Sequence, residues 1–388
     1  MVNIITGEGA TITPGFMLKM GERDITSNIH QRLISLTMTD EKEFQADTLV
    51  IELDDTDGLL ELPERGVVVS LYLGWQGSAW LGKGTFIVDQ VSHQGAPDRV
   101  TITARSADFR QKFSIAYEES WHDTTLGAIV NTIAARNNLE ASVAESLAGI
   151  AVSHIDQSKE SDAAFLTRLA SLNGGIVSVK NGRLLVLKAG SATNASGQTL
   201  PERTILRRSG DSHRFSISDR TSYTGVIAHW LDTKNPKQNA QINVERKAKS
   251  QSAPVVQHPN AASAQASPQS QKGQDTPYAE YMAGAPANPF TLKTVFSSQA
   301  QAKQAAEARW RQLQRRVVEF SITLAVGDES FCPEMSVRVS GFKKVIDEQR
   351  WIVSKVTHKL DQNGFVTTVA LEVNNADIEY VIEETNAK

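Results

Sequence analysis

Hydrophobic and polar positions alternate along the first hundred residues, and this period of two is typical of β-strands with one buried face. The alternation is clearest in RVTITAR (99–105), where Val100, Ile102 and Ala104 share one face. Glycine, aspartate and proline separate such runs, so the pattern predicts an antiparallel barrel or sandwich. The predicted strands between residues 16 and 105 are FMLKM, RLISLTM, DTLVIEL, VVVSLYL, TFIVDQV and RVTITAR.

Four strand-like segments of this region recur in the same order near the C-terminus. The matched pairs are LVIEL (49–53) with FSITL (320–324), PERGVVVS (63–70) with PEMSVRVS (333–340), FIVDQVSH (86–93) with WIVSKVTH (351–358), and VTITA (100–104) with VTTVA (366–370). Four matches in one order predict two related β-domains, in which residues 45–105 and 317–373 superpose. We expect His93 and His358 at equivalent places, sharing the same structural hydrogen bond. Three such chains carry six related domains, so the repeat fits a trimer that meets a sixfold ring.

Helical spacing replaces the strand pattern after Trp121. The first predicted helix lies in HDTTLGAIVNTIAARNN with Asp123 as its N-cap, and the second follows in DQSKESDAAFLTRLASLNGG with Ser158 or Ser161 as its cap. Asn181-Gly182 then joins two short strands in a predicted hairpin. The apolar helix faces are Leu126, Ile129, Val130 and Ile133, and Phe165, Leu166, Leu169 and Leu172. Residues 118–190 are therefore predicted to form a small α+β module.

Strands return at 203–245, before a sharp change of composition. Residues 246–290 carry prolines in a Gln, Ser and Ala background with almost no large aliphatic side chains, so we predict a flexible loop there. An amphipathic helix is expected at 297–316, and strands from both sides of the loop are expected to complete a second barrel. The predicted domains are a first β-barrel at 1–115, an α+β module at 116–200, a second β-barrel at 201–245 and 291–388, and the loop at 246–290.

Composition permits this organisation and excludes several classes of function. The chain of 388 residues is 40% hydrophobic and 22% charged, which is ordinary for a soluble protein of about two to three domains. A net charge of -4 provides no basic field for nucleic acid. The N-terminal sequence lacks a cationic region followed by an apolar run, and no segment approaches a membrane span, so we expect a cytoplasmic protein. Cys332 is the only cysteine, which excludes an intrachain disulfide and favours a small apolar residue at a strand start.

Candidate motifs for chemistry are weak. GSAWLGKGT (77–85) approaches the phosphate-binding pattern GxxxxGK(S/T), but Gly84 stands where a hydroxyl should hold magnesium, and a strand rather than a helix follows. Asp54, Asp55 and Asp57 could suggest a calcium site, but a turn made by Asx side chains explains them better. The eight histidines show no HxH, HxxH or HExxH spacing. We therefore predict no catalytic, cofactor-binding or metal-binding residue and no enzyme activity.

The second predicted helix also carries a recognisable pattern, which runs from Gln through Glu-Ser-Asp, Phe-Leu and Arg-Leu-Ala to Gly. Its members here are Gln157, Glu160, Ser161, Asp162, Phe165, Leu166, Arg168, Leu169, Ala170 and Gly174. In this pattern the chain resembles the late control gene D proteins of contractile-tailed phages, baseplate hub proteins related to the N-terminal part of VgrG spikes. Residues 341–373 resemble the closing barrel segment of that family, so the resemblance spans nearly the whole chain.

The resemblance implies a structural baseplate hub protein with two related β-barrels and a LysM-like module. It implies a homotrimer whose paired barrels form a pseudo-hexameric ring between the sixfold tail tube and the threefold central spike. The implied partners are the tail tube protein, the central spike protein, other baseplate proteins and a tape-measure protein, without specific nucleic-acid binding or stable membrane anchoring. The chain ends at Lys388 without a spike region, so a separate spike protein is expected to cap it. The implied location is the virion tail baseplate, after assembly in the host cytoplasm.

Two other functions stay open at this stage. A peptidoglycan-binding or cell-wall-acting tail component would need a carboxylate pair in a cleft or aromatic sugar platforms, and six Trp and six Tyr are scattered through the chain. A transcriptional regulator would need a DNA-reading helix, for which RWRQLQRR (309–316) is the candidate. Its apolar residues Trp310 and Leu313, and arginines that complement the helix dipole, favour a packed structural helix.

Overall fold

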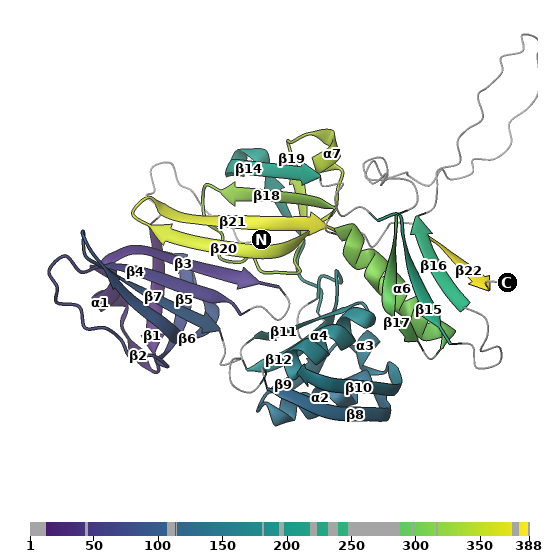
Figure 1. The fold of residues 1–388 in the computed structure, drawn as a ribbon. Helices are drawn as coiled ribbons and strands as arrows, with labels where there is room; N and C mark the ends of the chain where they lie inside the picture. The colour runs from purple at the N-terminus through teal and green to yellow at the C-terminus, as the bar shows by residue number, and fades with distance from the viewer. Residues whose placement is uncertain are drawn as a thin grey trace, which may run out of the picture.

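The computed structural model shows a mainly β chain with an α+β insert between two sets of strands, which confirms the predicted fold class (Figure 1). The described residues are 13–42, 46–106, 113, 115–180, 182–193, 198–217, 223–231, 240–246, 288–296, 298–315, 317–374 and 380–386. The predicted loop at 246–290 lies, except for its ends, outside the described residues.

The N-terminal strands form one curved sheet, here called the first barrel, around an aliphatic core. In β4 every second side chain is buried, namely Leu49, Ile51 and Leu53, because alternate residues of a strand face the same side. The elements are β1 (Pro14–Met20), β2 (Arg23–Asp24), α1 (Thr26–His30), β3 (Leu33–Glu41), β4 (Thr48–Asp54), β5 (Val68–Trp75), β6 (Leu81–Gln94) and β7 (Arg99–Ser106). They follow the order β3-β4-β7-β6-β5-β1-β2.

Strands from 203–217 and 318–373 form the second barrel, whose core includes a pair of large aromatic residues. Trp351 and Phe320 are buried with ring centroids 5.5 Å apart, and Trp351 Nε1 donates to the carbonyl of Ile346 at 3.0 Å. The elements are β13 (Arg203–Leu206), β14 (Gly210–Ile217), β18 (Val318–Leu324), β19 (Ser336–Ser340), α7 (Lys344–Asp347), β20 (Trp351–Asp361) and β21 (Gly364–Val373). Their order is β14-β18-β21-β20, with β19 on β20 and β13 on β19.

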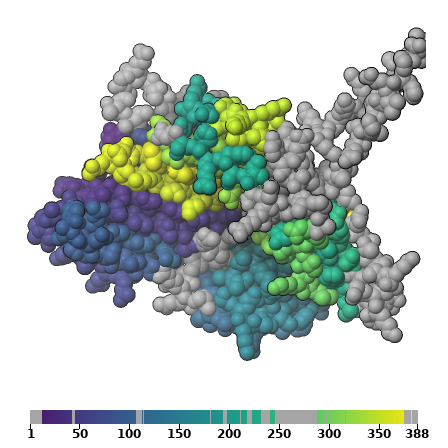
Figure 2. Space-filling view, turned by 45° about the horizontal axis from the view of Figure 1, so that its top comes forward, coloured from purple at the N-terminus to yellow at the C-terminus, as the bar shows by residue number. Residues whose placement is uncertain are grey.

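Both barrels belong to one 13-stranded sheet, because β20 pairs antiparallel with β3. In Figure 2 the yellow C-terminal residues lie directly against the purple residues of the first barrel. Each barrel keeps its own core, but Leu360 and Phe365 from the β20–β21 hairpin are buried in the core of the first barrel. The chain therefore joins its two halves by backbone pairing and by side-chain packing.

A separate four-stranded sheet contains strands that were expected in the second barrel. It consists of β15 (Gly225–Trp230), β16 (Ala240–Arg246), β17 (Pro289–Phe296) and β22 (Tyr380–Asn386), covered by α6 (Gln299–Arg315). Ala302, Ala306 and Trp310 of α6 are buried against this sheet. The physical reason is that an amphipathic helix must cover an apolar sheet face, and small alanines let it lie close to one. These strands supply that face, and the second barrel closes its core without them.

The α+β module has the predicted helices and hairpin, and also strands that the sequence pattern did not indicate. Its elements are β8 (Ala116–Thr125), α2 (Leu126–Arg136), β9 (Glu140–Val143), α3 (Glu145–Ala148), β10 (Ala151–Ser161), α4 (Asp162–Leu172), β11 (Gly175–Lys180) and β12 (Arg183–Lys188). Ser161 caps α4 by accepting from the amide of Ala164, as predicted. Thr125, not Asp123, caps α2. The reason is that the strand β8 continues through Asp123, so the helix begins later.

We expect Phe165→Ala to lower the free energy of unfolding of the module by about 3–5 kcal/mol, because Phe165 of α4 is completely buried in the core of the module. Chemical denaturation followed by circular dichroism measures the change. Asn131→Ala on the exposed side of α2 is the control and should change stability by less than about 0.5 kcal/mol. A tolerant Phe165 would instead indicate a side chain that is free to contact another protein.

Candidate functional site

The repeat itself is the strongest candidate for a functional feature. In the first barrel the strands follow the order β4-β7-β6-β5, and in the second they follow β18-β21-β20-β19, with antiparallel pairing throughout. A further strand lies beside each set, β3 on β4 and β14 on β18. The first repeat is therefore defined as β3–β7 and the second as β14 with β18–β21. This order confirms the repeat predicted from the sequence.

Irregularities in the strands coincide as well. Register shifts occur between Val88 and Gln90 of β6 and between Val353 and Lys355 of β20, which are the same positions of the matched segments FIVDQVSH and WIVSKVTH. A second pair of shifts, which the sequence comparison did not reveal, lies at residues 33–35 of β3 and 210–212 of β14. Bulges bend a strand and are built into a fold, so two coincident pairs indicate one duplicated barrel.

Two of the four sequence matches are out of register in the structure. The amide of Gly66 donates to Val88 O at 2.8 Å, and the amide of Glu334 donates to Val353 O at 2.9 Å. Gly66 and Glu334 are therefore equivalent, and both adopt positive φ, +89° and +66°. The shared Pro-Glu at 63–64 and 333–334 is thus a coincidence, offset by two residues. The match of VTITA with VTTVA is offset by one.

The joint between the repeats is a ladder from Lys355↔Glu41 to Asp361↔Ser35. On the inward face it buries Val356, Leu36 and Met38 completely. On the outward side Lys355 Nζ lies 2.5 Å from Glu41 Oε1, directly across the ladder. Backbone pairing sets the register of the joint, and the buried side chains make any other register unfavourable, since a slip by one residue would expose them.

The tip of the β20–β21 hairpin anchors the second repeat in the first. Phe365 packs against Trp75 with ring centroids 5.6 Å apart, and Trp75 Nε1 donates to Gly327 O at 3.0 Å. Gly327 lies so close to the Phe365 ring that an added Cβ would be 2.5 Å from it. Lys83 crosses the same boundary, donating to the carbonyls of Glu329 and Phe331 at 2.9 and 3.3 Å. Lys83 belongs to GSAWLGKGT (77–85), the weak phosphate-loop candidate, and in the structure its side chain connects the two barrels.

The α+β module is held to the first barrel by an ionic cluster whose two carboxylates are buried. Lys180 Nζ lies 2.6 Å from Asp40 Oδ1 and 2.5 Å from Asp47 Oδ1. Burial alone would lower the pKa of Lys180, but the two carboxylates raise it overall. Because buried charges require partners, this cluster favours a single position of the module on the first barrel.

His93 and His358 occupy equivalent ladder positions, but their predicted shared hydrogen bond is wrong. His358 is fully buried, and its Nδ1 lies 3.0 Å from Oγ1 of Thr367, its partner across the ladder. The side chain of His93 is 44% exposed, and its Nε2 lies 3.5 Å from Asp55 Oδ2. Burial and the nearby Lys83 hold the pKa of His358 well below its usual value. The two copies therefore place one residue type in two different environments.

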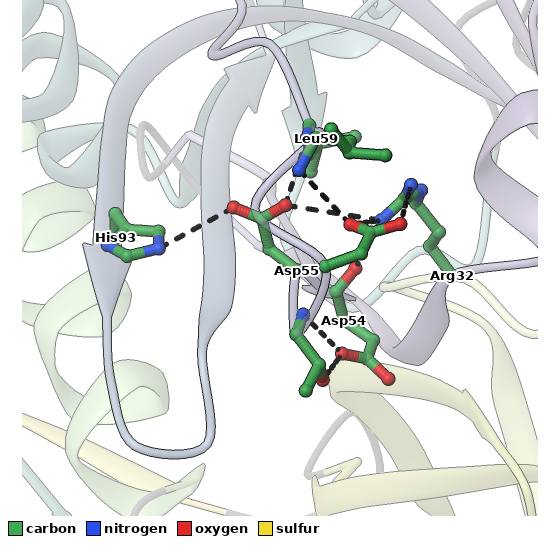
Figure 3. Close-up of polar contacts among 8 residues, drawn as sticks. Arg32, Asp54, Asp55, Leu59 and His93 are labelled. Atoms are coloured by element: carbon green, nitrogen blue, oxygen red, sulfur yellow. Dashed lines mark hydrogen bonds and ion pairs between the residues drawn. The ribbon is translucent and has the colours of Figure 1, made fainter.

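The acidic cluster after β4 forms side-chain turns (Figure 3). Asp54 accepts from the amide of Thr56 at 2.9 Å, and Asp57 accepts from the amide of Leu59 at 3.1 Å. Arg32 binds Asp57 through both guanidinium nitrogens at 2.7 and 2.6 Å, which together with Leu59 N holds the pKa of Asp57 at about 2. Asp54 and Asp57 thus each accept from an amide two residues later, which is the Asx turn that the sequence predicted.

Other candidate residues serve the fold in similar ways. Cys332 is partly buried against the core of the second barrel, and burial raises the pKa of its thiol. Arg309 of α6 stacks on Phe290 at 4.4 Å, so this part of the basic helix faces its own sheet. Strands β8 and β10 bring His122 and His154 together with Nδ1 atoms 3.1 Å apart, a pair that their separation in the sequence concealed.

Within the described part of the chain, no group of three or more His, Cys, Asp or Glu side chains is arranged to hold a metal ion. Across the same residues, no helix has the length and apolar character needed to span a membrane.

Comparisons with known proteins agree with this geometry. Residues 49–364 match the family described as phage tail baseplate hub (GPD). The chain is 56% identical over 376 residues to a protein of Escherichia phage 186 and 54% identical over 382 residues to one of Escherichia phage P2, covering 97% of each chain. Both relatives bear the name "Probable baseplate hub protein". In fold, the 43 kDa tail protein of prophage MuSo2 from Shewanella oneidensis is similar, with a TM-score of 0.62, 15% identity, and coverage of 92% of this chain and 98% of that one.

Gly327→Ala should lower the free energy of unfolding by about 1–3 kcal/mol, because the new methyl group must displace the Phe365 ring from the joint. Urea denaturation measures the loss. Gly149→Ala is the matched control: its φ is -83° and no atom lies within 4 Å of the added Cβ, so stability should stay within about 0.5 kcal/mol. Equal effects of the two substitutions would contradict the tight packing of the joint.

Stability should fall when the pH drops below 6.5, because the unfolded chain then protonates His358 while the folded chain does not. Between pH 7.5 and 5.5 this residue should account for about 1 kcal/mol of lost unfolding free energy. His358→Gln should remove that part of the pH dependence, measured by urea denaturation at both pH values. His93→Gln, at the equivalent exposed position, should leave it in place. An unchanged pH dependence in His358→Gln would show that His358 titrates normally in the fold.

Proposed function

Because the chain belongs to the phage tail baseplate hub (GPD) family, it is a baseplate hub protein of a phage tail, and we propose that it works there as a homotrimer. In this proposal, six barrels from three chains form a ring that continues the sixfold tail tube and receives a threefold central spike. The observation that carries the proposal is the β20–β3 ladder, which fixes two equivalent barrels side by side in one chain.

Two similar barrels in each chain allow a threefold assembly of chains to match a sixfold tube. Repeats with the same strand order can present similar surfaces six times around an axis, while every difference between them occurs three times. The structure supplies large differences of this kind. The α+β module and the four-stranded sheet with α6 each occur once per chain. They support a threefold exterior around a nearly sixfold ring.

For the division of the chain we propose four units in place of three. The first barrel ends before β8, the α+β module extends from β8 to β12, and the second barrel combines β13 and β14 with β18–β21. The fourth unit is the sheet β17-β15-β16-β22 with α6, which has its own buried cluster. Along the chain, this unit is connected to the second barrel between β14 and β15, between α6 and β18, and between β21 and β22, and it lies at one end of the molecule (Figure 1).

The proposed partners are further copies of this chain, the tail tube, the central spike and neighbouring baseplate proteins. The proposed location is the virion tail baseplate, reached after assembly in the host cytoplasm. A structural, non-enzymatic role is supported by the use of the candidate residues: Lys83, Asp57 and His358 each hold the fold together. A peptidoglycan-binding or cell-wall-acting role is not favoured by the family or by these contacts.

Reconstruction of the tail tip by electron microscopy tests the trimer. We expect three copies of the chain around the tube axis, with the six barrels in one ring. Native mass measurement of detergent-released tips gives an independent copy number. One or six copies per tip, or a position away from the axis, would overturn the proposed function. A monomeric state of the isolated chain would not, because tube and spike contacts complete the assembled ring.

A further inference from the structure

Each repeat has two strand edges that could pair with another repeat. One is formed by β3 or its counterpart β14, and the other by the second half of β20 or its counterpart in β6. Within the chain, one edge of each kind is paired. The edge of β3 is paired with β20. Its counterpart β14 ends the sheet and, among the described strands, pairs only with β18. The half of β6 that corresponds to the paired half of β20 is Gln90–Gln94, which among the described strands pairs only with β7. One unused edge of each kind therefore remains.

We propose that Val91–Gln94 of one chain pairs antiparallel with Arg214–Ile217 of a second copy of this chain, in the register of the internal joint. The repeat defines this register. Met38 pairs with Leu49 and Phe215 pairs with Phe320, and Leu49 and Phe320 are matched positions, so Met38 and Phe215 are equivalent. The internal pairs Val356↔Asp40, Thr357↔Thr39, His358↔Met38 and Lys359↔Thr37 then correspond to Val91 with Ile217, Ser92 with Ser216, His93 with Phe215, and Gln94 with Arg214. The inference rests on the proposed trimer and names its contacts.

Burial at the two joints distinguishes a used edge from an unused one. Val356 and His358 of the internal joint are 0% exposed, whereas the equivalent Val91 is half-buried and His93 is exposed. On the other edge, Ile217 is 37% exposed. The unpaired positions thus present apolar side chains that pairing with a neighbour would cover.

The composition of the two edges also fits pairing. Exposed edge strands are commonly protected against association by charged residues or proline. Gln90–Gln94 reads QVSHQ and contains neither lysine nor proline, and Arg214 is the only arginine or lysine in Arg214–Ile217. In the proposed register Arg214 lies opposite Gln94, so no like charges are opposed.

The intermolecular joint lacks the anchor of the internal one. Eight residues (359–366) separate His358 from its partner Thr367, but six (94–99) separate His93 from its partner Val100. The shorter hairpin therefore has no counterpart of the Leu360↔Phe365 pair that enters the neighbouring core. Backbone pairing and a smaller apolar contact remain, which suits a contact formed during assembly and not during folding of the chain.

Engineered disulfides test the register. In a Cys332→Ser background, Ser92→Cys and Ser216→Cys are combined, and tails assembled with this chain are mildly oxidised, because directly opposed residues of a ladder lie within disulfide reach. We expect covalent dimers and trimers on a non-reducing denaturing gel, confirmed by intact mass. The matched control combines Thr39→Cys with Thr357→Cys, the same register inside one chain, which should crosslink without adding chains. An offset control combines Ser92→Cys with Arg214→Cys and should crosslink much less.

The outcomes separate this inference from the proposed function. If tips contain three copies and the internal control crosslinks, but Ser92→Cys with Ser216→Cys does not, the edge pairing is wrong and the trimer stands. A disulfide to tube or spike protein would assign the edge to that partner and also overturn the pairing. Equal yields from the aligned and offset pairs would refute the register. A copy number other than three overturns the proposed function itself.

Discussion

One antiparallel ladder, between β20 and β3, governs the arrangement of the whole molecule. It merges two barrels with separate cores into one 13-stranded sheet, so the angle between them is set by backbone hydrogen bonds and not by a flexible linker. Side chains reinforce the same geometry through Trp75, Lys83 and the hairpin tip at Phe365. A ring built from such chains inherits this angle at every second joint, which leaves only one kind of contact to be formed between chains.

Buried polar groups make the joints specific. At β3, Lys180 sits between two carboxylates, and an arrangement that separated them would leave a charge buried without a partner. Within the second barrel, Thr367 connects His358 of the paired strand β20 to the backbone of Asp328. The apolar side chains of the β20–β3 ladder favour one register, and the contacts of Lys180 with Asp40 and Asp47 add a polar constraint on the position of the module. The contacts that stabilise the two barrels therefore also set how the barrels and the module are arranged.

The sequence predicted the repeat, the strands of the first barrel and the helices of the module, because alternation and capping are local signals. It could not predict the correct alignment of the copies, since the shared Pro-Glu is accidental and the equivalence of Gly66 with Glu334 depends on backbone bonds to distant strands. The separate sheet under α6 was missed for a related reason. The sequences of β15 and β16 predict strands, but nothing in them indicates which sheet these strands join. Likewise, nothing local indicated that equivalent histidines would be buried in one copy and exposed in the other.

The same ladder has a consequence for the order of events during synthesis. Residues 35–41 pair with residues 355–361, and the core of the first barrel includes Leu360 and Phe365. The core of the N-terminal barrel can therefore be completed only after residues 355–365 have been synthesised. Contacts between residues so far apart in the sequence form slowly during folding. A nascent or truncated chain exposes β3 as a third open edge. The last step in closing the first barrel is thus set by the order of the strands along the chain.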